Sequence, residues 1–143
     1  MLKNKNMDCL FCLIINAKAK AHIVYDSEFC IGFLDVRPVF YGHTLLVTKK
    51  HCNNLYDLDK NLESEFMADI KKLGEAVKIG TKSDGTLILV NNTVSQSIPH
   101  LHVHIIPRKF NDGLKGFLWP RLLYKTPEQM NEVADSIKSA LVK

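Results

Sequence analysis

Three histidines, His100, His102 and His104, alternate with aliphatic residues in the segment from residue 100 to residue 106. Alternation with a period of two predicts a β-strand whose imidazoles project to one face and whose aliphatic side chains project to the other. Neighbouring imidazoles are then rooted about 6.7 Å apart. Such a face can present nitrogen ligands to a metal ion or nucleophiles to a substrate, and half of the chain's six histidines lie in it.

Two kinds of chemistry fit this imidazole face. The three histidines could converge on one ion as a three-His catalytic zinc site. Alternatively, a neutral imidazole, the form of roughly three quarters of unperturbed histidines at pH 7, could attack phosphorus and form a covalent intermediate. The flanking imidazoles would then hydrogen-bond the phosphate oxygens. The spacing alone leaves both interpretations open.

A second set of ligand-type residues lies outside the histidine segment. Cys9 and Cys12 form a C-x-x-C pair, and His51 follows two lysines. On a helical turn the two thiols share one face, and a structural zinc ion wants four such ligands. A histidine at one end of the triad could be the fourth ligand. This interpretation uses more residues than a three-His metal site, which leaves both cysteines without a role.

Length and composition indicate one domain over residues 1–143. Hydrophobic residues make up 46% and charged residues 24% of the chain, and the formal net charge is +4. These values are ordinary for a globular protein, and the charge does not argue for an anionic partner. No run approaches the roughly 18 apolar residues of a membrane span, and no signal peptide is apparent. We therefore expect a cytoplasmic protein whose cysteines are thiols or metal ligands.

The patterns predict an α+β domain with a five-stranded antiparallel sheet and two main helices. Apolar residues at helical spacing predict one helix from about residue 62 to residue 78. Thr126, Pro127 and Gln129 predict the start of a C-terminal helix with a buried apolar stripe. The nearly continuous apolar run from residue 86 to residue 90 predicts a central strand. The other strands are expected at residues 23–25, 29–34, 43–48 and 100–106.

Basic and aromatic residues are interleaved from Arg108 to Lys125. Such a pattern can serve as a platform for single-stranded nucleic acid. A surface loop whose aromatic side chains fold inward explains the same pattern. Because no other nucleic-acid module is present, we expect nucleic acid not to be a partner.

The segment from His100 to Ile106 resembles the signature of the histidine-triad superfamily of nucleotide hydrolases and transferases. The resemblance extends over residues 33–38, 42–44 and 49–51, over Gln96-Ser97, and over residues 112–114 and 119–121, which are similar to the tail of many bacterial members. It covers the chain from about residue 9 to residue 141. It implies a homodimer in which two five-stranded sheets join into one ten-stranded sheet.

The resemblance also implies roles for individual residues. His102 would attack the α-phosphorus of a nucleotide, and water would release a nucleoside monophosphate from the nucleotidyl-histidine. His104 would contact the phosphate or the leaving group, Ser97 would contribute to catalysis, and His43 would support the triad. The main-chain carbonyl of His100 would fix the tautomer of His102. The nucleotide-binding residues implied are Leu10, Phe11, Ile14, Phe33, Asp35, Val36, Asn91, Gln96, Ser97, His102 and His104.

Some branches of the superfamily bind a structural zinc ion, and the resemblance carries that site to Cys9, Cys12, His51 and His100, with about one zinc ion per chain. It implies a hydrolase acting on adenosine or other purine 5′-phosphoramidates or on diadenosine polyphosphates. The alternatives are a nucleotide-binding regulatory protein with little turnover and a three-His catalytic metalloenzyme.

Overall fold

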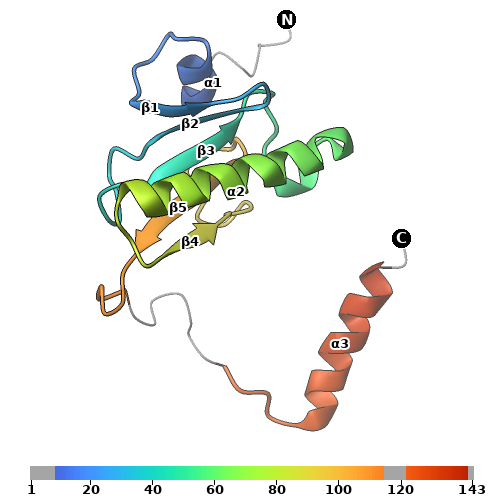
Figure 1. The fold of residues 1–143 in the computed structure, drawn as a ribbon. Helices are drawn as coiled ribbons and strands as arrows, with labels where there is room; N and C mark the ends of the chain where they lie inside the picture. Colours follow the sequence, from blue (N-terminus) through green and yellow to red (C-terminus); the bar gives the residue numbers. More distant parts are fainter. Residues whose placement is uncertain (1–8, 115–121, 142–143) are drawn as a thin grey trace, which may run out of the picture. The chain divides into compact units, whose positions relative to one another are not determined.

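The computed structural model describes residues 9–114 and 122–141. The chain divides into two compact units, Met1–Asp112 and Gly113–Lys143. The single domain over residues 1–143 stays a prediction. Figure 1 shows the sheet with its helices in the first unit and one long helix in the second.

The first unit contains a five-stranded sheet with the order β1-β2-β3-β5-β4, and every neighbouring pair is antiparallel. This confirms the predicted α+β class and the number of strands. The helices of this unit are α1 (Leu10–Ile15) and α2 (Glu63–Gly80). The strands are β1 (Ile23–Asp26), β2 (Cys30–Leu34), β3 (Thr44–Thr48), β4 (Gly85–Leu89) and β5 (His102–Arg108).

The two faces of the sheet are covered by different helices. On one face the long helix α2 packs its apolar stripe, from Phe66 to Val77, against buried side chains of the sheet. On the other face α1 packs Phe11 and Ile14 against residues of β2 and β3. Strands β2 and β3 therefore supply alternate side chains to two separate cores, as strands covered on both faces do.

Strand β5 has the two faces that the sequence predicts. Leu101, Val103 and Ile105 are fully buried in the core under α2. His102 and His104 pair with Val47 and Leu45 of β3 and lie on the α1 side. The strand begins at His102, so His100 precedes the regular strand instead of forming part of it.

The prediction that the apolar run of residues 86–90 forms a central strand is wrong for the single chain. Within the described residues, β4 pairs only with β5 and lies at the edge of the sheet. Side chains of β4 face α2, where Ile88 lies next to Gly74. A continuous apolar run indicates that both faces of a strand are covered. It does not indicate whether both edges of the strand are hydrogen-bonded to other strands.

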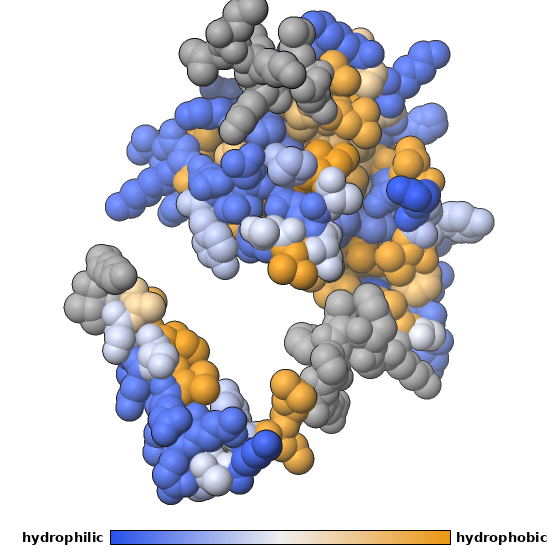
Figure 2. All heavy atoms as spheres, turned by 180° about the vertical axis from the view of Figure 1, so that it is seen from behind, coloured by the Kyte–Doolittle hydropathy of each residue, from blue (hydrophilic) through white to orange (hydrophobic). Residues whose placement is uncertain are grey.

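The second unit contains α3 (Pro127–Leu141). Its predicted start is confirmed, because Thr126 Oγ1 accepts a hydrogen bond from the Gln129 amide at 3.1 Å. The predicted stripe is not buried within this unit, where α3 has no buried residue and Ile137 is 59% exposed. Figure 2 shows apolar side chains along one side of this helix and polar ones along the other. Amphipathic spacing predicts such a side, but burial depends on a partner surface.

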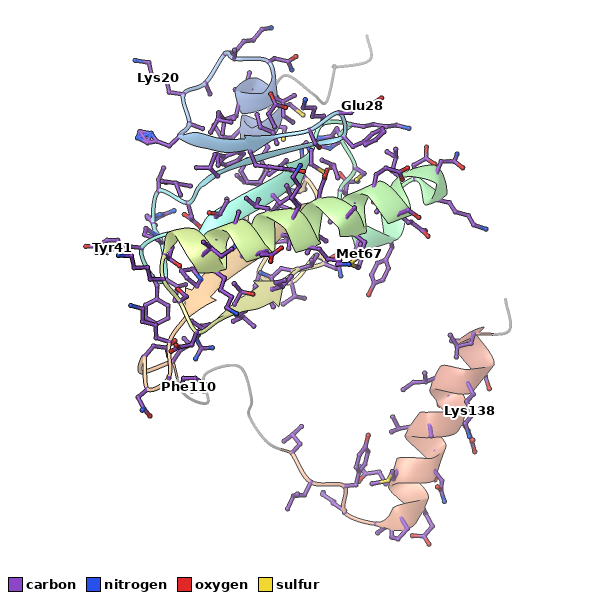
Figure 3. All side chains as sticks on the ribbon, in the orientation of Figure 1. Lys20, Glu28, Tyr41, Met67, Phe110 and Lys138 are labelled. Atoms are coloured by element: carbon purple, nitrogen blue, oxygen red, sulfur yellow. The ribbon has the colours of Figure 1, made fainter. Side chains whose placement is uncertain are left out.

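The aromatic side chains of the Arg108–Lys125 segment that the structure describes are not folded inward. Phe110 is 86% exposed and Tyr124 is more than half exposed. Phe110 and Tyr41 project away from the first unit in Figure 3. The remaining aromatic and basic residues of that pattern lie outside the described residues, as does the family-like tail at 119–121; they are Lys115, Phe117, Trp119 and Arg121.

None of the described helices is both long enough and apolar enough to cross a bilayer.

Candidate functional site

His102 opens strand β5 with its ring held by the main chain. Its Nδ1 lies 2.7 Å from the carbonyl oxygen of His100, which can only accept a hydrogen bond, so Nδ1 carries the proton. In the neutral ring the lone pair is therefore on Nε2. The ring is 5% exposed and packs edge-on against Phe11 at 5.1 Å. A nucleophilic imidazole requires this arrangement of a fixed tautomer and a restrained ring.

His104 lies two residues further along and is bonded to His43, which immediately precedes β3. His43 Nε2 lies 2.9 Å from His104 Nδ1, and the Val39 amide donates to His43 Nδ1 at 3.1 Å. Gly42 has φ of +96°, a conformation that glycine adopts readily, and this turn places His43 next to His104 of β5. An Asp35 carboxylate oxygen lies 3.7 Å from His43 Nε2.

Burial keeps both of these imidazoles neutral. Desolvation lowers the pKa of His104 to about 4, and its histidine neighbours, first His102 and then His43, act in the same direction. Desolvation also lowers the pKa of His43, which the nearby Asp35 carboxylate partly opposes. At neutral pH this pair can donate and accept hydrogen bonds but carries no charge.

A cavity of about 380 Å³ lies beside these histidines. Its volume is within the range of pockets that bind small molecules. Nine of the predicted nucleotide-binding residues line it together: Leu10, Phe11, Ile14, Phe33, Asp35, Val36, Ser97, His102 and His104. An apolar end from α1 and β2 thus joins a polar end formed by the histidines.

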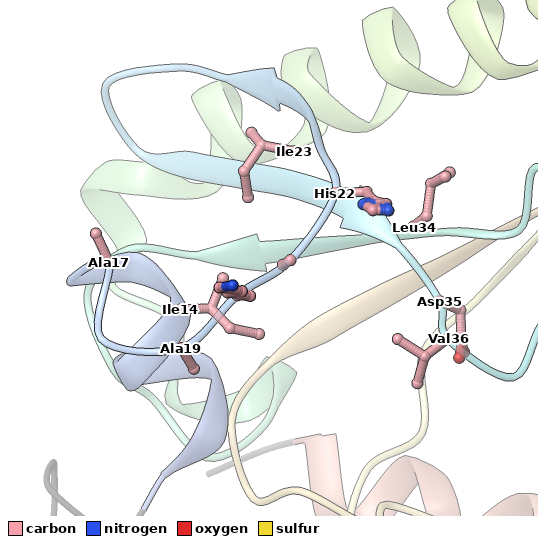
Figure 4. A pocket seen from close by; sticks show the side chains of 10 residues that line it. Ile14, Ala17, Ala19, His22, Ile23, Leu34, Asp35 and Val36 are labelled. Carbon is pink, nitrogen blue, oxygen red and sulfur yellow. The ribbon is translucent and has the colours of Figure 1, made fainter.

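A second cavity of about 680 Å³ adjoins the first. It shares six lining residues with the first cavity, Asp35 and Val36 among them, but is lined by neither His102 nor His104. Figure 4 shows that its walls come from α1, from the connection that carries Ala17 and Ala19, and from the ends of β1 and β2. The imidazole site therefore opens onto further space at its Asp35 end.

Three of the predicted catalytic and nucleotide-binding residues do not line the first cavity, namely His43, Asn91 and Gln96. His43 lies against two residues that do, His104 at 2.9 Å and Asp35 at 3.7 Å. The side-chain oxygen of Gln96 accepts the Thr93 amide at 2.9 Å, and its nitrogen donates to the Asn53 carbonyl. Asn91 precedes this loop and is half-buried. Contacts of Asn91 and Gln96 with a phosphate group therefore stay predictions.

The four predicted metal ligands, Cys9, Cys12, His51 and His100, are brought together beneath the triad. Their ligand atoms all lie within 4.8 Å of one another. The two imidazole Nδ1 atoms are 3.2 Å apart, and Cys12 Sγ lies 3.3 Å from His51 Nδ1 and 3.6 Å from His100 Nδ1. Cys9 Sγ lies 3.4 Å from His100 Nδ1.

The donor set fits a tetrahedral zinc ion. Zinc bonded at about 2.3 Å to sulfur and about 2.0–2.1 Å to nitrogen separates two nitrogens by about 3.3 Å and sulfur from nitrogen by about 3.5 Å. His100 Nε2 lies 2.7 Å from the Thr48 carbonyl and His51 Nε2 lies 3.4 Å from Asn53 Oδ1. Both Nε2 atoms are thus donors, and both Nδ1 lone pairs point into the cluster, as metal ligands require.

The raised pKa of a thiol in this cluster is consistent with a cation binding among the four ligands. Burial, together with the neighbouring Cys9, raises the pKa of Cys12 to about 11. Two thiolates would therefore not coexist here without a positive charge between them.

The structure does not assemble a three-His metal site. His100 presents Nδ1 to the cysteines, while His104 Nδ1 accepts from His43. A second group of ligand-type atoms, Asp35, His43 and His104, also lies within 4.8 Å. However, Nδ1 of His43 accepts a hydrogen bond from the Val39 amide, so the proton of the neutral ring is on Nε2. Because this Nε2 donates toward His104, it has no lone pair to offer a metal ion. Neither group includes His102.

Several residues of the site carry no motif in the sequence. Thr48 orients His100 through its carbonyl, and Asn53 contacts both His51 and Gln96. Lys20 and Arg37 line the first cavity beside Asp35. A main-chain contact such as that of Thr48 cannot be recognised from residue type, whereas Arg37, two residues after the predicted Asp35, could have been found from the sequence.

The fold and site define a small α+β protein in which an imidazole-lined cavity adjoins a cysteine–histidine cluster. The chain matches the HIT domain over residues 16–111 and belongs to this family. It is 30% identical to adenosine 5′-monophosphoramidase HNT1 of Saccharomyces cerevisiae over 116 residues, which cover 78% of this chain and 70% of the yeast protein.

Solved structures agree with the fold. SMU.412c from Streptococcus mutans superposes with a TM-score of 0.81 at 30% identity, covering 94% of this chain and 85% of that one. A zinc-bound histidine triad family protein from Mycobacterium smegmatis superposes with a TM-score of 0.70 at 29% identity, covering 94% and 99% of the two chains.

Proposed function

We propose that the protein is a nucleotide hydrolase that cleaves at the α-phosphorus of adenosine or other purine 5′-phosphoramidates or of diadenosine polyphosphates. The observation that carries the proposal is the His102 ring, which lines the cavity with Nδ1 donating to the His100 carbonyl. Membership of the HIT family and the similarity to a yeast adenosine 5′-monophosphoramidase support the substrate class.

The reaction proceeds in two displacements at phosphorus. The Nε2 lone pair of His102 forms a bond to the α-phosphorus, and the bond to the amine or phosphate leaving group breaks, the leaving group keeping the electron pair. The hydrogen bond to the His100 carbonyl stabilises the positive charge that develops on the ring. Water then attacks the same phosphorus, the bond to Nε2 breaks, and a nucleoside monophosphate is released.

Different walls of the cavity bind the base, the ribose and the phosphate of the nucleotide. The apolar residues Leu10, Phe11, Ile14, Phe33 and Val36 hold the base, and the Asp35 carboxylate accepts hydrogen bonds from the ribose hydroxyls. The neutral His104, with Nε2 protonated, donates to a phosphate oxygen or to the leaving group. Ser97 is the residue of the 91–99 loop that we assign to the phosphate.

Cys9, Cys12, His51 and His100 would hold a structural zinc ion. When bound, it would supply the positive charge that two buried thiolates need. Because His100 also orients His102 through its carbonyl, the cluster fixes the start of β5. The likeness to a zinc-bound family member supports this assignment. The thiols described are all free, in keeping with the predicted cytoplasmic location.

We further propose a homodimer with a ten-stranded sheet. Strand β4 is apolar but lies at the sheet edge, and Ile88 is 46% exposed. An uncovered apolar edge strand invites pairing with an equivalent strand. Light scattering of the purified protein at several concentrations should give twice the chain mass, and a concentration-independent monomer would contradict the dimer.

The test of the function compares kcat/KM for an adenosine 5′-phosphoramidate and for diadenosine tri- and tetraphosphate in the native protein and in His102→Ala. Loss of turnover of every substrate is expected. His102→Gly with added imidazole serves as the matched control, because free imidazole can replace the missing nucleophile. Near-native rates in His102→Ala, or tight nucleotide binding without turnover in the native protein, would contradict the proposal.

A further inference from the structure

Both polar atoms of the Gln96 side chain form hydrogen bonds with the protein main chain. Its Oε1 accepts the Thr93 amide at 2.9 Å, within the same loop. Its Nε2 donates to the Asn53 carbonyl at 2.5 Å, in a segment 43 residues earlier. Gln96 does not line the cavity, whereas the next residue, Ser97, does. The amide therefore connects two parts of the backbone beside the site.

Two further hydrogen bonds join the same parts of the chain. The Leu55 amide donates to Asn92 Oδ1 at 3.0 Å, and the Leu101 amide donates to the Cys52 carbonyl at 2.7 Å. Segment 52–55 therefore holds the loop and the start of the triad at three points, of which Gln96 supplies the middle one. The segment follows His51 directly, and Asn53 Oδ1 contacts the His51 ring at 3.4 Å.

The loop that Gln96 restrains has an unfavourable backbone conformation. Thr93 has φ of +72° and Ser95 has φ of +59°, a left-handed region that non-glycine residues rarely occupy. Residues 91–96 contain no glycine, which would adopt this conformation at less cost. Residues in such regions keep their conformation only when surrounding contacts impose it. The hydrogen bond from the Thr93 amide to Gln96 is one such contact.

We propose that Gln96 is a positioning residue that fixes Ser97 beside the phosphate by tying the strained loop to segment 52–55. This inference rests on the proposed hydrolase function. Gln96 acts through the loop without touching the substrate, so its loss misplaces Ser97 while the nucleoside pocket of α1 and β2 stays intact. Small displacements of a group that contacts the reacting centre lower the rate by up to about 100-fold.

The experiment compares two substitutions at Gln96 with a control in the same loop. Gln96→Leu removes both hydrogen bonds at similar size. Gln96→Glu keeps an acceptor for the Thr93 amide but turns a carboxylate toward the Asn53 carbonyl. Val94→Ala is the control, since Val94 is 79% exposed and lies in the same loop. For each protein we would measure kcat, KM, the dissociation constant of adenosine 5′-monophosphate, and hydrogen exchange of residues 91–99.

Both Gln96 variants should lower kcat by about 10- to 100-fold while KM changes by less than about threefold. Hydrogen exchange of the loop should accelerate at least about tenfold in Gln96→Leu, with exchange in β3 and β5 unchanged. Val94→Ala should match the native protein in all four measurements.

A direct phosphate contact would give a different pattern. Gln96→Glu would then weaken binding of the monophosphate far more than Gln96→Leu, because the carboxylate repels the phosphate, and loop exchange would stay native. That pattern, or unchanged kcat in Gln96→Leu, would overturn the inference. Since His102→Ala tests the nucleophile separately, inactivity of that variant together with native behaviour of Gln96→Leu would refute the positioning role alone.

Discussion

His43 Nε2 lies 2.9 Å from His104 Nδ1, and the direction of this hydrogen bond is fixed. The Val39 amide donates to His43 Nδ1, so the neutral His43 ring carries its proton on Nε2 and donates it toward His104. His104 must therefore accept on Nδ1 and carry its own proton on Nε2. A main-chain amide outside the triad thus sets the tautomer of the third triad histidine.

Removing the Nε2–H donor of His43 should allow His104 to carry its proton on either ring nitrogen. We expect His43→Leu to lower kcat by about 10- to 100-fold, because His104 loses the bond that holds Nε2–H toward the substrate. His43→Gln should recover part of the rate, since its amide nitrogen can take the place of Nε2. Steady-state kinetics with an adenosine 5′-phosphoramidate measures the difference. Equal rates for the two variants would show that the donor has no role.

The pH dependence of stability should reflect the neutral state of His104. Its pKa in the folded protein is about 4, below the usual value near 6.5. The unfolded chain therefore binds more protons between these values, and the free energy of unfolding falls as the pH drops from about 6.5 to about 4. Above about pH 6.5 the contribution is complete.

Urea unfolding at pH 7, 6, 5 and 4 measures this effect, which for one histidine is at most about 1.4 kcal/mol per pH unit. Heteronuclear NMR of the His104 ring provides a direct check, because the ring should stay neutral at pH 5.5. A His104 resonance that titrates near pH 6.5 would contradict the argument.

Metal analysis tests the cysteine–histidine cluster. Protein purified without added metal should contain about one zinc ion per chain, and Cys12→Ser should lower the affinity for zinc by more than about 100-fold. Cys52→Ser is the matched control, because it also removes a thiol but lies outside the cluster. Its zinc content should be native.

Chelation separates a structural ion from a catalytic one. Removal of the ion should lower Tm by several degrees, because the folded state loses a ligand that the unfolded chain does not bind in the same way. The fraction that remains folded should keep most of its kcat, with a modest loss because the cluster fixes the His100 carbonyl that orients His102. A chelated protein that stays fully folded but has lost its activity would instead favour a catalytic metal.

Local sequence patterns predicted most of the fold and several of the side chains that it brings together. The alternation at residues 100–106 correctly assigned Val103 and Ile105 to the core and His102 and His104 to the other face. The C-x-x-C pair and the histidine after two lysines identified residues that the fold brings together around His100. These patterns are informative because period and ligand type are local properties of the chain.

What the sequence did not predict depends on partners distant in the chain. The edge position of β4 follows from strand order, and burial of Ile137 would require a surface outside its own unit. The commitment of Gln96 to Asn53 joins main-chain and side-chain atoms 43 residues apart. No residue type marks a carbonyl that accepts such a bond.

The Asp35 carboxylate should determine whether the substrate carries ribose or deoxyribose. Its Oδ1 already accepts the Arg37 amide at 2.8 Å, which orients the carboxylate at the end of β2 and leaves further lone pairs for hydroxyl groups. A hydrogen bond to a charged acceptor contributes about 1.5–3 kcal/mol. The native protein should therefore prefer an adenosine 5′-phosphoramidate over its 2′-deoxy analogue by about 10- to 100-fold in kcat/KM.

Asp35→Asn retains an acceptor for the Arg37 amide but removes the charge, so the preference should shrink mainly through a lower kcat/KM for the ribose substrate. If both substrates lost activity equally, Asp35 would act on the His43–His104 pair and not on the sugar.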